Sequence, residues 1–264
     1  GLLIQTELSQ PGVALVSGVS ATRIEKSSNE KSRLLVHDSL GGQHLADLVI
    51  LAVGAQPNGE LAAAAGAQLG RGGALQVNRA MRTNLRNVFA AGDCVETYHR
   101  LFDAPRYLSL GTVAHKQGRV AGENSVETGM MRQFAGSVGT QSLKVFGLAV
   151  ARTGVGDAEG REAGFDPITM KSTFNDHKAY YPGATRLFMH VTGDRRSGRL
   201  LGAQIVGAAN AEVSKRIDIF ATALFQGASI EAVSDFDLSY TPPFSSPWDP
   251  VQMAAQEWVR AHSG

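Results

Sequence analysis

The chain has 264 residues and a formal net charge of +1, so nothing in its charge favours a nucleic acid or an anionic membrane as a partner. Its length suits one large or two ordinary domains, and it has no run of about 18 apolar residues to span a bilayer. A single cysteine, Cys94, excludes an intramolecular disulfide framework. With no signal peptide at the start, these features predict a soluble, cytoplasmic protein.

The first 54 residues predict a mixture of helix, hairpin and one buried strand. Residues 1–10 are typical of the end of a helix, and residues 13–16 predict a short strand. Alternating segments at 19–24 and 33–37, separated by the polar turn 26–31, predict an antiparallel hairpin. The apolar run 47–54 ends in Gly54 and predicts a strand buried on both faces. Such a strand needs covering helices, which the short preceding segment does not supply.

Residues 55–130 contain the pattern around which the functional argument is built. An alanine-rich helix is expected at 60–67, a glycine-rich turn at 70–73, strands at 74–77 and 84–91, and a helix at 112–128. The strand 84–91 leads into Gly92 and Asp93, where small residues let a ligand approach the backbone. The carboxylate of Asp93 can accept hydrogen bonds from sugar-like hydroxyls, and the following helix start offers free N–H groups. The pattern indicates half of a dinucleotide site, although Gly-Asp is also a common turn.

The remainder of the chain has a different texture. Residues 129–139 have little periodicity and predict a linker. Strands expected at 142–146, 168–174, 186–191 and 200–206 indicate an antiparallel sheet. An amphipathic helix at 211–225 and further helices at 230–236 and 251–262 complete an α+β domain.

Four motifs in this order resemble one family, the flavin-dependent pyridine nucleotide–disulfide oxidoreductases. They are DLVILAVGAQPN (47–58), TNLRNVFAAGD (83–93), TVAHKQGRVAGEN (112–124), and a C-terminal set that includes AYYPGA (179–184), SKRIDIFATAL (214–224) and DLSYTPPFSSPWDPV (237–251). The branch they resemble contains coenzyme A-disulfide reductases, NADH oxidases and NADH peroxidases. The likeness extends over nearly the whole chain.

The resemblance implies an α/β chain with remnants of Rossmann-like NAD and FAD domains, followed by an α+β dimerisation domain with an antiparallel sheet. Residues 1–54 would be the C-terminal part of an NAD(P)-binding domain and residues 55–130 the C-terminal segment of an FAD-binding domain. Residues 138–264 would form the homodimer. The family's GxGxxG loops and redox cysteine have no counterpart in this sequence. We therefore expect the C-terminal portion of a longer enzyme, inactive by itself.

For the FAD site, the resemblance assigns Asp93 and Gly92 to the ribityl chain. It places Gly111, Thr112 and Val113 at the start of the helix that faces the flavin, where N–H groups stabilise negative charge. Gly54 would leave room for the nicotinamide ring, although a turn glycine explains it as well. No metal site is predicted.

Other residues near the predicted FAD site receive structural interpretations. Cys94 beside a buried strand is expected to act as a small apolar side chain without redox function. Gln117, Arg119 and Glu123 are expected on a solvated helix surface, and His115 as a satisfied or exposed histidine.

Two tyrosines are predicted to act in catalysis across the dimer. In the coenzyme A-disulfide reductase group, two tyrosines of one subunit reach the redox cysteine of the other, and the positions that look like them are Tyr180 and Tyr240. Phenols donate hydrogen bonds to a sulfur or oxygen anion without carrying charge. Tyr181 is an alternative to Tyr180. The charged run 214–218 predicts a solvated helix face with an Arg216–Asp218 pair, or a subunit interface.

The predicted reaction passes hydride from NADH or NADPH to FAD, then electrons to a cysteine outside this sequence, and on to a disulfide, persulfide, peroxide or oxygen. Alternatives are an NADH oxidase or peroxidase of the same family, or a dimerisation module without chemistry. The sequence leaves open which nicotinamide cofactor and which final acceptor are used.

Overall fold

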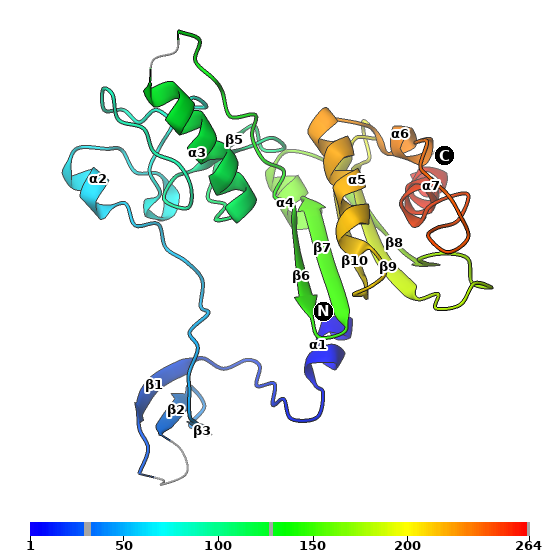
Figure 1. Cartoon of the computed structure of the whole chain (residues 1–264), viewed down its shortest axis with the longest axis horizontal. Coiled ribbons are helices and arrows are strands. Elements are labelled where there is room, and N and C mark those ends of the chain that lie inside the picture. Colours follow the sequence, from blue (N-terminus) through cyan, green and yellow to red (C-terminus); the bar gives the residue numbers. More distant parts are fainter. Residues whose placement is uncertain (29–32, 127–128, 263–264) are drawn as a thin grey trace. The chain divides into compact units, whose positions relative to one another are not determined.

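A computed structural model of the chain describes residues 1–28, 33–126 and 129–262 (Figure 1). The chain divides into two compact units, an N-terminal unit of residues 1–55 and a C-terminal unit of residues 56–264. Among the residues described, no helix is both long enough and apolar enough to cross a membrane.

The N-terminal unit contains one short helix and one small sheet. Helix α1 (Leu2–Leu8) precedes strands β1 (Ala21–Lys26), β2 (Leu34–Asp38) and β3 (Gln43–Ala46), which pair antiparallel in the order β1-β2-β3. The predicted hairpin is confirmed, while residues 29–32 of its turn lie outside the described residues. The strand predicted at 13–16 is wrong, because these residues have no strand structure.

The apolar run 47–54 does not form the predicted buried strand. Its side chains are largely exposed, with Leu48 at 75%, Ile50 at 80% and Val53 at 90%. A strand forms only where its backbone N–H and C=O groups meet those of a neighbour. In the described part of the N-terminal unit the strands pair among themselves and none pairs with this run, although Leu51 and Val53 line a cavity together with residues of β1. The prediction of a buried strand at 47–54 is therefore wrong.

The first half of the C-terminal unit contains more loop than predicted. It consists of α2 (Glu60–Ala64), the 3-10 turn η1 (Arg71–Gly73), the hairpin β4 (Thr97–His99) with β5 (Ala104–Arg106), and α3 (Gly111–Ser125). The predicted strands 74–77 and 84–91 are wrong, because only isolated bridges form there, such as the parallel bridge between Leu75 and Val95. The helix predicted at 112–128 is confirmed in the described part, up to Ser125.

Residues 129–139 pack into the unit instead of serving as a free linker. Phe134 is buried in a cluster with Met81, Val113 and Val120, which places it against α3. Its N–H donates to the carbonyl of Arg79 at 2.7 Å. The segment has no helix or strand, in line with a linker, while buried Phe134 and Val138 anchor it to the unit.

The predicted antiparallel sheet is confirmed and has five strands. These are β6 (Gln141–Val145), β7 (Leu148–Gly154), β8 (Pro167–Asn175), β9 (Arg186–Asp194) and β10 (Leu200–Ala208), in the order β6-β7-β10-β9-β8. Every neighbouring pair is antiparallel. The mixed α/β fold with an antiparallel sheet matches the expected class.

Four helices accompany this sheet, namely α4 (Asp157–Glu162), α5 (Val213–Gln226), α6 (Ile230–Ser234) and α7 (Pro250–His262). Helix α5 packs on β7 and β10, and α7 packs on β8 and β9 (Figure 1). Ile217 and Phe220 of α5 are fully buried in the largest apolar cluster. Gly193 lets α6 and α7 approach β9, because a Cβ there would lie 2.3 Å from Ile230 and 2.6 Å from Trp258. This packed domain positions the loops that carry the two predicted tyrosines.

Candidate functional site

The turn at Gly92 and Asp93 is fixed to helix α3. Gly92 has φ +88°, in the left-handed region that favours glycine, and its N–H donates to Oε1 of Gln117 at 3.0 Å. Nε2 of Gln117 donates to the hydroxyl of Thr97 at 3.0 Å. Asp93, the next residue, is exposed, so its carboxylate is open to a ligand.

Gln117 is therefore not a solvated helix-surface residue, as was predicted, because its side chain is completely buried. It lies four residues after Val113 and three before Val120, which are both buried on the same face of α3. This spacing in the sequence already indicated that Gln117 lies on the buried face of the helix. Arg119 and Glu123 do lie on the exposed face, where they form an i,i+4 ion pair of 2.9 Å.

The start of α3 opens onto a cavity of about 830 Å³ in the C-terminal unit, lined by Gly111, Thr112, Val113 and Lys116 together with residues of α5. In the described part of the chain, no hydrogen bond uses the N–H of Gly111 or Thr112. The N–H of Val113 donates to the carbonyl of Leu110 at 2.8 Å, and the Val113 side chain is buried. Two of the three predicted residues thus present free donors at a helix N-terminus, where negative charge is stabilised.

The Gly92–Asp93 turn and the start of α3 lie together in the C-terminal unit, whereas Gly54 lies in the N-terminal unit. The first turn of α3 lies against the Gly92 turn, since a Cβ on Gly92 would be 3.6 Å from that of Ala114. Gly54 belongs to the N-terminal unit and has φ +101° with open space around it. A residue with a side chain would be strained there.

Cys94 and His115 have the environments expected of structural residues. The thiol of Cys94 donates to the carbonyl of Ala91 at 3.4 Å, and the side chain packs against the buried Leu75 and Val95. His115 is exposed on α3.

The two predicted tyrosines come together from loops far apart in sequence. Tyr180 lies in the loop 176–185 between β8 and β9, and Tyr240 in the segment 235–249 between α6 and α7. Desolvation, together with the proximity of Tyr180 and a hydrogen bond to it, raises the pKa of Tyr240. Both rings reach solvent, with Tyr180 75% and Tyr240 43% exposed. Tyr181 points its ring edge-to-face at His177, with centroids 6.1 Å apart.

Arg216 was missed by the sequence reasoning. The predicted pair with Asp218 is wrong, because Asp218 instead accepts from Lys215 at 3.0 Å. The Arg216 side chain is 5% exposed and forms an ion pair with Asp249 at 3.1 Å. Arg216 lies three residues after Val213 and four before Phe220, both on the buried face of α5, so the helical register again carried the signal.

A smaller cavity of about 330 Å³ lies beside the β4–β5 hairpin and contains His99. Desolvation lowers the pKa of His99 to about 4, and the nearby Arg106 and Arg152 act in the same direction, whereas Glu159 opposes them. Two ion pairs of 2.8 Å use the surrounding charges, Arg106 with Glu162 and Arg152 with Glu159. The cavity therefore presents paired charges, with a structural role.

Comparisons with known proteins identify the family and the fold. A family model described as pyridine nucleotide-disulphide oxidoreductase matches residues 2–118, and the model of the same family's dimerisation domain matches residues 140–250. Among curated proteins, the chain is 38% identical over 216 residues to the NAD(P)H sulfur oxidoreductase (CoA-dependent) of Pyrococcus furiosus, covering 82% of this chain and 48% of that protein. It is 29% identical over 258 residues to the NADH oxidase of Methanocaldococcus jannaschii, covering 98% of this chain and 55% of that protein.

Among solved structures, the NAD-dependent persulfide reductase from A. fulgidus aligns with a TM-score of 0.90 at 35% identity, covering 100% of this chain and 47% of that one. The chain thus spans about half the length of the curated relatives it matches. The two family models, the ordered motifs and the shared architecture agree. The chain belongs to the pyridine nucleotide-disulphide oxidoreductase family.

Proposed function

We propose that this chain forms part of an FAD-dependent NAD(P)H oxidoreductase that reduces a disulfide or persulfide of a small thiol such as coenzyme A. The overall reaction consumes NAD(P)H, a proton and the disulfide, and yields NAD(P)⁺ and two thiols. The observation that carries this proposal is that Tyr180 and Tyr240, two neutral donors from different loops, are both open to solvent and lie near enough for Tyr180 to raise the pKa of Tyr240. The names of two relatives support it, since the Pyrococcus furiosus protein is called a sulfur oxidoreductase and the A. fulgidus protein a persulfide reductase.

FAD and NAD(P)H are the cofactors of the family, and residues of this chain fit one end of FAD. When bound, FAD would accept a hydride from NAD(P)H and deliver two electrons to a thiol-level acceptor. The exposed carboxylate of Asp93, held by the Gly92 turn, would accept hydrogen bonds from the ribityl hydroxyls. The free N–H groups of Gly111 and Thr112 would stabilise negative charge on the flavin. Gly54 would leave space for the nicotinamide ring.

The tyrosine pair would act on the sulfur. The phenol of Tyr240 is protonated at neutral pH even at its ordinary pKa of about 10, and the raised pKa acts in the same direction, so that it remains a donor. A thiolate that forms near these hydroxyls gains hydrogen bonds without a fixed positive charge beside it. In a homodimer formed through residues 138–264, the pair of one subunit would serve the redox cysteine of the other. The homodimer and a cytoplasmic location stay predictions.

The experiment uses the complete protein that contains this chain and replaces each tyrosine with phenylalanine. We expect Tyr240→Phe to lower kcat/KM for coenzyme A disulfide by about 10²-fold, the lower range for removing one donor to a developing anion. Flavin reduction by NAD(P)H, followed by stopped-flow absorbance, should not change. Tyr181→Phe is the matched control, since its ring faces His177 and should leave both steps intact. Unchanged disulfide reduction in Tyr180→Phe and Tyr240→Phe would refute the role of the pair.

The NADH oxidase reading stays open because of the Methanocaldococcus jannaschii relative. Oxygen consumption measured beside disulfide reduction separates the two activities. Faster oxygen than disulfide turnover, with no effect of Tyr240→Phe, would favour the oxidase. No turnover with any acceptor would favour a dimerisation module.

A further inference from the structure

The two tyrosines lie in loops that have no regular structure of their own. Residues 176–185 connect β8 to β9, and residues 235–249 connect α6 to α7. An interaction between two phenols that are open to solvent is too weak to hold such loops together, because it competes with water. Something else must fix their relative position.

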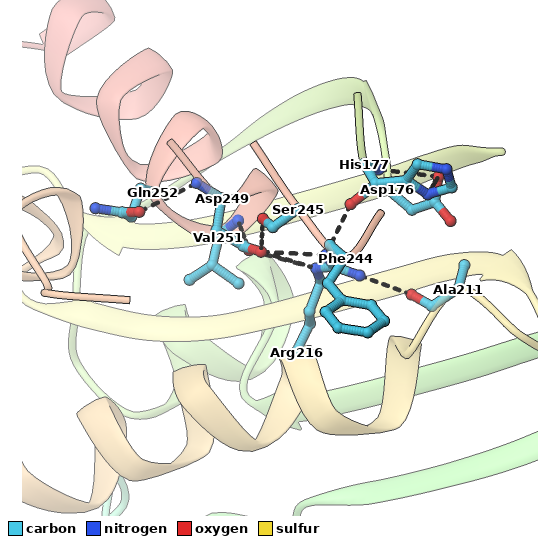
Figure 2. A network of polar contacts seen from close by, with 9 residues as sticks. All are labelled: Asp176, His177, Ala211, Arg216, Phe244, Ser245, Asp249, Val251 and Gln252. Atoms are coloured by element: carbon cyan, nitrogen blue, oxygen red, sulfur yellow. Dashed lines mark hydrogen bonds and ion pairs between the residues drawn. The ribbon is translucent and has the colours of Figure 1, made fainter. Parts of the chain in front are cut away.

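Arg216 contacts the backbone of both loops. Figure 2 shows its guanidinium at the centre of a polar network that draws in both segments. Nη2 donates to the carbonyl of Asp176 at 2.8 Å and to the carbonyl of Phe244 at 3.0 Å. Tyr180 follows Asp176 by four residues, and Tyr240 precedes Phe244 by four. One guanidinium nitrogen therefore bridges the two loops at equal sequence distances from the tyrosines.

The charge of Arg216 is neutralised and its direction fixed by Asp249. Nε of Arg216 donates to both carboxylate oxygens at 3.3 and 3.2 Å, and Nη2 donates to Oδ2 at 3.1 Å. Nη1 donates to the carbonyl of Ala211 at 2.8 Å. Both side chains of the pair are nearly excluded from solvent. A guanidinium presents several donors in a rigid plane, which lysine does not reproduce.

Each carboxylate beside Arg216 also secures its own loop. The carboxylate of Asp249 accepts from the hydroxyl of Ser245 at 2.6 Å and from the N–H of Val251 at 2.9 Å, at the start of α7. The carboxylate of Asp176 accepts from the N–H of Thr185 at 2.8 Å, which closes the neck of the loop that carries Tyr180. The network thus joins α5, α7 and both loops.

We propose that Arg216 is a positioning residue that holds the loops of Tyr180 and Tyr240 in register, so that their hydroxyls face one site. The inference rests on the proposed function only where it assigns the two hydroxyls a role in disulfide reduction. The contacts that define it do not depend on any activity. Arg216 acts through the loops and touches neither substrate nor cofactor.

The first test measures the loops in this chain without turnover. Amide hydrogen exchange in residues 176–185 and 235–249 should accelerate in Arg216→Lys by about tenfold or more, the effect of losing one hydrogen bond to a charged group. Arg260→Lys, an exposed arginine on α7, is the matched control and should leave both loops unchanged. The same exchange is measured in Asp249→Asn, which replaces Arg216→Lys as the test variant if the latter yields too little folded protein. Unchanged exchange in both loops would overturn the proposal.

The second test measures the tyrosine contact itself with 3-fluorotyrosine and ¹⁹F NMR, assigning the five tyrosines by single Tyr→Phe substitutions. In the wild-type background, Tyr180→Phe should lower the titration midpoint of Tyr240. In the Arg216→Lys background, the same substitution should leave that midpoint unchanged, because the hydroxyls no longer meet. A shift of the same size in both backgrounds would also overturn the proposal.

The kinetic test uses the complete protein. Arg216→Lys should slow disulfide reduction while leaving flavin reduction by NAD(P)H intact, and it should add little to the loss already caused by Tyr240→Phe. Fully additive losses, or an equal loss in flavin reduction, would contradict a positioning role. If Tyr240→Phe alone has no effect, the proposed function of the pair fails, and the exchange and ¹⁹F measurements still decide the role of Arg216.

Discussion

Acidification should weaken the C-terminal unit through His99. This side chain is 4% exposed, and burial lowers its pKa from 6.5 to about 4. Between pH 6.5 and about 4, His99 therefore binds a proton in the unfolded chain but not in the folded one. Its contribution to the free energy of unfolding is present above about pH 6.5 and is lost as pH falls toward about 4. A tenfold change in proton affinity is worth about 1.4 kcal/mol, so the whole effect is at most about 3.5 kcal/mol, of which about 2 kcal/mol is lost between pH 7 and pH 5.

The assay is urea unfolding at several pH values, followed by fluorescence of the buried Trp258. His99→Asn is the informative variant, because its amide oxygen can replace Nδ1 as acceptor for the N–H of Leu101. The free energy of unfolding of this variant should vary with pH by about 2 kcal/mol less than that of the wild type between pH 7 and pH 5. The exposed His115, replaced by Asn, is the control and should leave the wild-type slope intact. Equal slopes in His99→Asn and the wild type would refute the reasoning.

Two further predictions concern packing around the site. Gln117→Met should cost about 2–4 kcal/mol of unfolding free energy, because it leaves two partly or fully buried polar groups unpaired, whereas Gln226→Met on an exposed position should cost little. An equal effect of both substitutions would contradict a stabilising role for the hydrogen bonds of Gln117 to Gly92 and Thr97. Gly193→Ala should cost about 1–3 kcal/mol by overpacking, while Gly118→Ala in open space within α3 should gain about 0.5–1 kcal/mol in the same urea assay. The opposite order would show that the helices do not approach β9 as described.

The sequence predicted the fold best where a pattern is completed by neighbours within the chain. The alternating strands and the amphipathic helix α5 were found because the five strands of the antiparallel sheet pair with one another. The run 47–54 has an equally strong pattern, yet none of the strands described in its unit pairs with it. An apolar or alternating pattern predicts that a segment can form a strand, but the strand forms only where a neighbouring strand supplies hydrogen-bond partners.

The candidate site was predictable in part. Tyr180 and Tyr240 were identified from motifs, but their proximity depends on how two irregular loops fold, and no local pattern encodes that. Arg216 and Gln117 were misassigned because polar residues on helices are usually solvated. Both occupy positions in register with buried neighbours, so helical phase outweighs residue type there.

The exposed run 47–54 has a consequence for handling this chain in solution. Residues 48–53 are without charge, rich in β-branched and aliphatic side chains, and unpaired along the backbone. Such a segment is a template for intermolecular strand pairing, and a net charge of +1 provides little repulsion between molecules to oppose it. We therefore expect residues 48–53 to promote association between molecules, and a lysine on that segment to oppose it.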